Sequence, residues 1–310
     1  MHKNSLSGYL FALTAVFFWS INLIIASSFA TSLMPMEIAF GRWLIAGVIL
    51  LFIARKNVKE SFSDLLRHWK LVLALAVTGM VFDNTLVYYA GRTASAIDMG
   101  LLDVTGPIFL VFLSRIFLKT PITGRQWLGL AVALFGVTVI ILNGDFTRLK
   151  NFQFVPGDFL MLLNTFSFAV YSFLQYKRPP QISQSAMLAA TAVVGAVILL
   201  PLMLLTTPPA LLRRFNGEDL AVIFYLGVFN SVLSYLAWNS ALAAIGNVKT
   251  SIIYYLLPLF SGVEAYLFLG EKLYSADFIG GILVIGGIAL VSLKRKATEK
   301  SSLLFKLIPV

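Results

Sequence analysis

The sequence of 310 residues has no cysteine, only two histidines, and few charges, since Asp, Glu, Lys and Arg make up 12% of it. The absence of cysteine excludes a disulfide scaffold, thiol catalysis and thiolate zinc sites. Low charge also excludes disorder, which needs low hydrophobicity and high charge. An ordinary soluble domain is excluded as well, because about 25% of its residues would be charged.

The chain is rich in apolar residues, which make up 59% of it, and its mean hydropathy is +0.87. A membrane-spanning helix needs about 20 mostly apolar residues. Ten such stretches occur, at about 8–29, 36–54, 69–90, 96–118, 124–142, 157–176, 184–206, 218–240, 248–269 and 276–293. The fold class we predict is an all-α membrane protein with ten transmembrane helices. The longest loop, about 55–68, mixes apolar and basic residues and favours an interfacial helix.

The net charge of +10 indicates membrane topology rather than a nucleic-acid partner, because Lys and Arg lie between the apolar runs. With the N-terminus inside, sixteen Lys and Arg residues fall in inner segments and six in outer ones. Cytoplasmic loops carry the excess of these residues. We therefore expect a multi-pass protein of a bacterial-type inner (plasma) membrane with both termini in the cytoplasm.

The two halves of the chain are similar in sequence. A shift of 151 residues superimposes Pro107 on Pro258. The same shift aligns two pairs of glycines, Gly129 with Gly280 and Gly136 with Gly287. Each half holds five predicted spans, and an odd number forces the second unit into the membrane upside down. We expect a first five-helix repeat at 1–148, a second, inverted repeat at 149–296 and a cytoplasmic tail at 297–310.

Two short motifs accompany this duplication. Residues 35–43 (PMEIAFGRW) open the second span, and residues 268–273 (FLGEKL) precede the glycine pair 280–281. Together with the paired halves, these motifs resemble the EamA-like branch of the drug/metabolite transporter superfamily. The resemblance covers 8–293 and implies a transporter of amino acids, drugs or other metabolites, without a cofactor. The first half departs from the motif at 119–121 (KTP), so no specificity is carried over.

Four ionisable residues lie well inside the predicted spans: Arg42, Asp83, Asp103 and Glu264. At a rise of about 1.5 Å per residue, all four lie roughly 7–11 Å below the outer face. One carboxylate can pair with Arg42, while the others must hold a proton, bind a cation or reach water. We expect Asp103, with Asp83 or Glu264, to couple solute movement to protons. The alternative is an ion-paired packing network.

Two prolines mark weak points in the predicted helices. Pro107 deprives the carbonyl of Asp103 of its helical donor, and Pro258 does the same to Tyr254, the residue that the 151-residue shift aligns with Asp103. Transporters use bent or broken helices to line central sites. We expect hinges at both prolines; the alternative is a pair of inert kinks, which membrane helices tolerate.

Aromatic rings and mid-span amides supply the rest of the predicted site. Rings offer stacking and cation–π contacts to aromatic or cationic solutes, and an amide within the membrane needs a partner. Core packing and interhelical hydrogen bonds are the alternatives. The predicted substrate-binding residues are Trp19, Asn22, Asp83, Tyr88, Asp103, Phe168, Tyr171, Asn230, Trp238 and Tyr254, with Asn84 and Asn164 as further amides of interest.

These features favour a secondary transporter that exports amino-acid-like or cationic and aromatic solutes by alternating access with protons. A second reading is an uptake or exchange carrier for a nucleoside-like metabolite such as S-adenosylmethionine. A membrane enzyme or a non-catalytic membrane subunit is the alternative of another class. No H-E-x-x-H, G-x-S-x-G or Walker motif occurs, which argues against an enzyme and against a metal site. The expected partners are a small solute, protons and the lipid bilayer, and the protein is a monomer or a homodimer.

Overall fold

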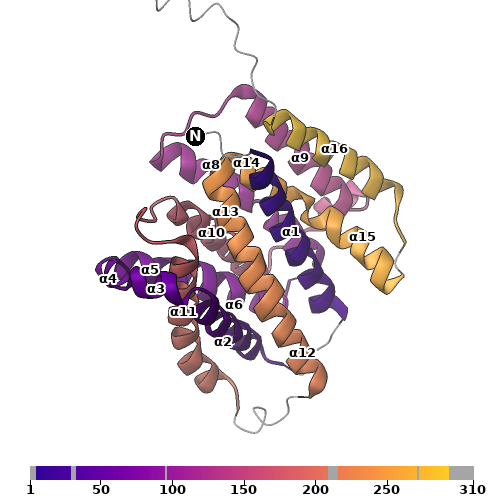
Figure 1. Ribbon diagram of the computed structural model, residues 1–310. Coiled ribbons are helices and arrows are strands. Elements are labelled where there is room, and N and C mark those ends of the chain that lie inside the picture. Colours follow the sequence, from indigo (N-terminus) through magenta and orange to yellow (C-terminus); the bar gives the residue numbers. More distant parts are fainter. Residues whose placement is uncertain (1–4, 29–32, 95, 209–215, 271, 293–310) are drawn as a thin grey trace, which may run out of the picture.

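The computed structural model describes residues 5–28, 33–94, 96–208, 216–270 and 272–292, which form helices and turns without a strand (Figure 1). Within these ranges nine segments are long and apolar enough to cross a membrane. They are Pro35–Ile53, Trp69–Ala90, Met99–Phe117, Gly124–Ile141, Pro156–Gln175, Gln184–Thr206, Gly217–Ile245, Asn247–Phe268 and Ser275–Ser292. The all-helical membrane class is confirmed, and nine of the ten predicted spans match.

The first predicted span corresponds to α1, Ser5–Ser28. Its apolar part with described side chains, Leu6–Ile21, is shorter than the other nine. The total of ten spans therefore stays a prediction.

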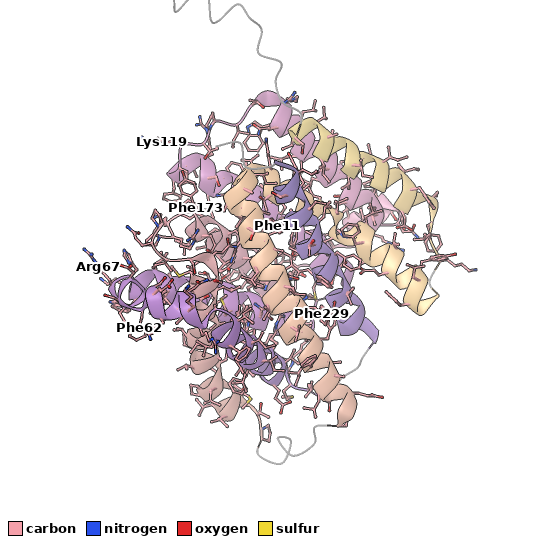
Figure 2. All side chains as sticks on the ribbon, viewed as in Figure 1. Phe11, Phe62, Arg67, Lys119, Phe173 and Phe229 are labelled. Atoms are coloured by element: carbon pink, nitrogen blue, oxygen red, sulfur yellow. The ribbon has the colours of Figure 1, made fainter. Side chains whose placement is uncertain are left out.

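The remaining helices of the first half run up to the loop near residue 150. They are α2 (Pro35–Ile53), α3 (Arg55–Glu60), α4 (Phe62–Arg67), α5 (Trp69–Ala76), η1 (Val77–Phe82), α6 (Asp83–Ala90), α7 (Ala96–Asp103), α8 (Gly106–Phe117), α9 (Gly124–Ile141) and η2 (Phe146–Asn151). The predicted interfacial helix is helical, as the pair α3 and α4, and Figure 2 shows Phe62 and Arg67 at the outer edge of this pair.

The second half begins at Pro156. Its elements are α10 (Pro156–Gln175), α11 (Gln184–Thr206), α12 (Gly217–Tyr225), η3 (Leu226–Leu233), α13 (Ser234–Ile245), α14 (Asn247–Ile253), η4 (Tyr254–Leu256), α15 (Leu257–Leu269) and α16 (Ser275–Ser292). The C-terminal helix α16 lies beside α9, and α13 lies beside α1 (Figure 1).

Two spans contain a stretch of wider π-helix that the sequence did not lead us to expect. η1 interrupts the span α5–α6, and η3 interrupts the span α12–α13. Gly79 in η1 and Asn230 in η3 are related by the same shift of 151 residues. Since π turns are rare and occur often at functional sites, these two segments draw attention to the residues beside them.

Both predicted weak points are breaks in the helix. α7 ends at Asp103 and α8 begins at Gly106, directly before Pro107. In the other half, the short 3₁₀ segment η4 separates α14 from α15, whose second residue is Pro258. Proline lacks an N–H and cannot continue a helix without loss of a hydrogen bond, which explains why both breaks lie just before it.

The contact between α9 and α16 depends on residues without a side chain. A Cβ placed on Gly136 would lie 2.7 Å from the carbonyl oxygen of Gly280, and one on Gly287 would lie 2.5 Å from that of Gly129. Small residues let membrane helices approach closely. The glycines of α9 and α16 therefore allow the two helix backbones to pack closely.

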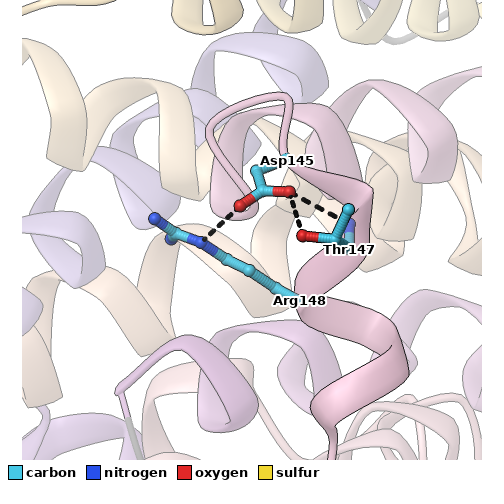
Figure 3. A network of polar contacts seen from close by, with 3 residues as sticks. All are labelled: Asp145, Thr147 and Arg148. Carbon is cyan, nitrogen blue, oxygen red and sulfur yellow. Dashed lines mark hydrogen bonds and ion pairs between the residues drawn. The ribbon is translucent and has the colours of Figure 1, made fainter.

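A polar turn follows α9 and closes the loop to α10 (Figure 3). Asp145 accepts hydrogen bonds from the Thr147 hydroxyl at 2.5 Å and from the Thr147 backbone N–H at 3.1 Å. Arg148 lies 3.6 Å from the other carboxylate oxygen. The hydroxyl of Thr147, then its N–H, and the charge of Arg148 hold the pKa of the exposed Asp145 below its usual range, so this residue is ionised at neutral pH.

Candidate functional site

A small cavity of about 20 Å³, enough for about one water molecule, lies where α6, α7 and α8 of the first half meet α10, α13, α14 and η4 of the second. Its polar lining combines two carboxylates with an amide and several hydroxyls. The lining residues are Asp83, Asp103, Gly106, Pro107, Leu110, Asn164, Thr165, Phe168, Ala169, Ser172, Trp238, Ser251 and Tyr254. Six of the predicted site residues are among them: Asp83, Asp103, Phe168, Trp238, Tyr254 and the proline Pro107.

The two residues at the helix breaks meet across this cavity. The Tyr254 hydroxyl donates a hydrogen bond to Asp103 Oδ2 at 3.0 Å. Asp103 is the last residue of α7 and Tyr254 the first of η4, so each half contributes one partner from its own break. A carboxylate with one phenol donor keeps lone pairs free for a further hydrogen bond. The arrangement can therefore hold a proton or an amine of a solute.

A second carboxylate, Asp83, lies at the start of α6 directly after the π turn η1. Its Oδ2 accepts from the Tyr235 hydroxyl at 2.7 Å and from the Asn84 amide at 3.0 Å. The Asn84 amide also donates to the Gly79 carbonyl oxygen at 2.7 Å, a residue five positions earlier. The amide of Asn164 donates to the backbone oxygen of Asp83. The wider turn and these donors aim the carboxylate at the cavity.

Aromatic rings form the wall behind the two acids. Trp19 does not line the cavity, but its ring centroid lies 5.3 Å from that of Phe168, 5.3 Å from that of Trp238 and 6.1 Å from that of Tyr254. Its indole N–H donates to the backbone oxygen of Asn230 at 3.1 Å. Trp19 and Phe168 pack against both large apolar clusters of the protein, so the cavity lies at their junction.

Several predicted site residues lie away from the cavity. Tyr171 is fully buried against Gly79 and accepts a hydrogen bond from the Asn239 amide at 2.7 Å. Asn230 and Tyr88 contact Arg42 instead. Glu264 lies between α15 and α1, and the side chain of Asn22 lies outside the described part of the chain. In place of these residues, the cavity uses Thr165, Ser172 and Ser251, which sequence reasoning missed.

The helical spacing of residues in the sequence could have identified two of the missed hydroxyls. Thr165, Phe168 and Ser172 follow one another at spacings of three and four residues, which places them on one face of α10. Ser172 accepts a hydrogen bond from the indole N–H of Trp238 at 2.9 Å. The Thr165 hydroxyl is buried in the cavity wall and lies beside the Asp103 carboxyl group.

The ion pair between Arg42 and a carboxylate that the sequence allowed does not occur in the described part of the chain. Among the described residues, the ion pairs are Lys56 with Glu60 and Arg148 with Asp145. The guanidinium of Arg42, 2% exposed, instead donates to Ser231 Oγ at 2.9 Å and to the side-chain oxygen of Asn230. Both acceptors belong to the π segment η3. Arg42 therefore joins α2 to η3 through neutral oxygens, and neither cavity acid has a cation of the described residues within 4.0 Å.

The Arg42 contacts predict a loss of stability in Arg42→Lys. An ammonium is a point charge, whereas the guanidinium is a fork with five donors, so Lys cannot satisfy Asn230 and Ser231 together. We expect a loss of about 1–3 kcal/mol, measured as a lower unfolding temperature of the purified protein in detergent. The control is Arg92→Lys at an exposed position, expected within about 0.5 kcal/mol of the parent. Equal unfolding temperatures for the two variants would contradict the assignment.

No group of three or more His, Cys, Asp or Glu residues in the described ranges is arranged to hold a metal ion. The site offers carboxylates, a phenol, hydroxyls, an amide and aromatic faces. Such groups can form hydrogen bonds and cation–π contacts with polar and cationic groups.

Comparisons with known proteins agree with this geometry. The profile of the EamA-like transporter family matches residues 6–142 and again residues 155–293. An uncharacterized transporter of Archaeoglobus fulgidus is 28% identical over 94% of this chain and 99% of its own length. The uncharacterized transporter YyaM of Bacillus subtilis is 27% identical over 83% and 84% of the two chains. The resemblance predicted from the sequence motifs is confirmed.

Two further comparisons concern a relative whose transported solute is named and a solved structure with a similar fold. A probable terminal-alkyne amino-acid exporter of Streptantibioticus cattleyicolor is 28% identical over 73% of this chain and 74% of its own. One solved crystal structure superimposes with a TM-score of 0.76 at 17% identity, covering 92% of this chain and 96% of that one. At such identity the structural match supports the fold alone.

Proposed function

Because the chain belongs to the EamA-like transporter family, and is a multi-pass membrane transporter rather than an enzyme, we propose that it exports small organic solutes by alternating access in exchange for protons. The solute class we propose is amino-acid-like or cationic and aromatic. The observation that carries the proposal is the cavity in which Asp83 and Asp103 lie among aromatic rings, with no Lys, Arg or His of the described residues within 4.0 Å of either carboxylate. The amino-acid exporter among the relatives supports the same class.

The proposed architecture is a pair of inverted five-helix repeats, 1–148 and 149–296, with ten spans. Contacts between related positions support it. Asp103 bonds to Tyr254, and Asn84 donates to the Tyr235 hydroxyl at 3.1 Å; in each pair the two positions differ by 151 residues. Residues that a two-fold operation exchanges can touch each other only near its axis. The double match of the family profile supports the duplication as well.

The glycine contacts support the same pseudo-two-fold axis. Gly129 approaches Gly287 and Gly136 approaches Gly280, and the shift of 151 residues converts one contact into the other. In this arrangement α9 and α16 are related helices that pack against each other. We place both termini in the cytoplasm of a bacterial-type inner membrane, on the Lys and Arg distribution.

Under this proposal the two helix breaks let the halves rearrange around the cavity. Asp103 and Tyr254 lie at these breaks, so movement there changes the access and the hydrogen bonding of the carboxylate together. A carboxylate that binds an amine when ionised releases it on protonation, because the attraction between the charges is lost. Solute and proton then occupy the cavity acids in turn, which is exchange.

The test is transport by the purified protein in proteoliposomes. A panel of amino acids and aromatic amines is first screened for a rise in unfolding temperature, and the hits are tested in counterflow and under an imposed proton gradient. We expect accumulation that depends on the gradient, with the solute recovered unchanged. Conversion of the solute would support an enzyme, and gradient-independent uptake of every hit would contradict proton exchange.

A further inference from the structure

Glu264 is a buried acid that the cavity does not use. Its side chain is 3% exposed on α15, and it is absent from the lining of the cavity. Carboxylate oxygen Oε1 lies 2.8 Å from Ser20 Oγ of α1, while Oε2 has no hydrogen-bond partner in the described part of the chain. No Lys, Arg or His there lies within 4.0 Å of it. An ionised carboxylate in this place would be buried without the donors that such a charge needs.

The contacts of Ser20 decide where the hydrogen atoms lie. Ser20 Oγ is 2.6 Å from the backbone oxygen of Phe17 and 2.8 Å from Glu264 Oε1. A hydroxyl has one hydrogen to donate. Two oxygens 2.6 Å apart need a hydrogen between them, and a serine in a helix commonly donates to a carbonyl of the preceding turn. If Ser20 donates to Phe17, the hydrogen of the Ser20–Glu264 contact comes from Glu264.

We propose that Glu264 holds a proton in this conformation, as a neutral carboxylic acid that donates from Oε1 to Ser20 Oγ. Among the described residues around it, α1 presents Ser20 and α12 presents Tyr225, a phenol whose hydroxyl donates to the Phe18 backbone oxygen at 3.4 Å. No cation is needed for this arrangement. The structure thus contains a proton-binding site apart from the cavity that holds Asp83 and Asp103.

Release of this proton changes the contact between α1 and α15. An ionised Glu264 would need a hydrogen bond from the Ser20 hydroxyl, which could then no longer donate to the carbonyl oxygen of Phe17. Without that change the two helices would separate. α1 belongs to the first half of the chain and α15 to the second, so the proton strengthens a contact between the halves. Its use in transport rests on the proposed function; its presence does not. Glu264 would then be a proton site in addition to the cavity acids, at which solute and proton alternate.

Infrared difference spectroscopy of the purified full-length protein tests the protonation directly. We expect a carboxylic-acid C=O band at neutral pH that shifts to lower frequency in D₂O, disappears in Glu264→Gln and moves to higher frequency in Ser20→Ala, which removes the acceptor. Asp145→Asn is the control and leaves the acid band unchanged, because Asp145 is exposed and ionised. If Glu264→Gln removes carboxylate bands and no acid band, the proposal is wrong.

If Glu264→Gln does not fold, the protonation of Glu264 can still be tested. The spectrum of Ser20→Ala and the shift in D₂O are both measured on proteins that retain Glu264. A carboxylic-acid band with the same frequency in Ser20→Ala as in the parent protein would overturn the assignment. A transport experiment is separate from the spectroscopy. For Glu264→Gln in proteoliposomes, we expect the rate of solute transport with a proton gradient to equal its rate of solute exchange without one. If the parent protein carries none of the panel solutes, the proposed function fails while the spectroscopic result stands.

Discussion

Asp103→Asn is expected to abolish proton-driven transport while the protein still folds. The amide has the shape of the carboxylate and can still accept the hydrogen bond that Tyr254 donates at 3.0 Å. It can neither carry a negative charge nor exchange a proton at neutral pH. We expect the initial rate under a proton gradient to fall at least about tenfold, equivalent to about 1.4 kcal/mol. Proteoliposomes with an imposed gradient and a solute identified by the panel provide the measurement.

Two control variants separate the charge of Asp103 from its surroundings. Tyr254→Phe removes the donor but retains the acid, so proton-driven transport should persist with an altered pH dependence. Asp145→Asn removes an exposed carboxylate on the loop after α9 and should leave transport unchanged (Figure 3). An unchanged pH dependence in Asp103→Asn would remove this residue from the proton pathway.

Sequence reasoning found the membrane class, nine of the described spans and the two residues that meet at the helix breaks. Hydropathy identifies a span because lipid and protein interior exclude water alike. The link between Asp103 and Tyr254 came from proline chemistry and the duplication, and both can be recognised in the sequence without a structure. The hydrogen bond between them is a consequence of the fold that the sequence did not state.

Rotation about each helix axis could not be predicted, because lipid tails are as apolar as the side chains of the core. Phe168 and Tyr171 illustrate this: they are three residues apart on α10, yet Phe168 lines the cavity and Tyr171 packs beneath η1. The π segments η1 and η3 add to the difficulty, since a wider turn rotates every residue that follows it. Charge alone allowed Arg42 a carboxylate partner, whereas the neutral partners Ser231 and Asn230 lie in such a segment.

Gly287→Ala is expected to produce a large loss of stability through a clash between α16 and α9. The new Cβ would lie 2.5 Å from the carbonyl oxygen of Gly129 and 2.7 Å from the backbone nitrogen of Ala133. Both neighbours are backbone atoms of α9, which cannot rotate away as a side chain would. Overpacking typically costs about 1–3 kcal/mol, and a clash with backbone atoms places this variant at the upper end.

The adjacent residue supplies the matched control for this prediction. A Cβ added to Gly286 would meet no described atom within 4 Å, so Gly286→Ala adds the same methyl group without a clash. Because alanine favours helix over glycine by about 0.5–1 kcal/mol, this variant should match or slightly exceed the parent in unfolding temperature. Thermal unfolding and gel filtration in the same detergent compare the two variants. Equal stability would mean that α9 and α16 do not pack through their glycines, and it would remove the main steric support for the two-fold relation between the halves.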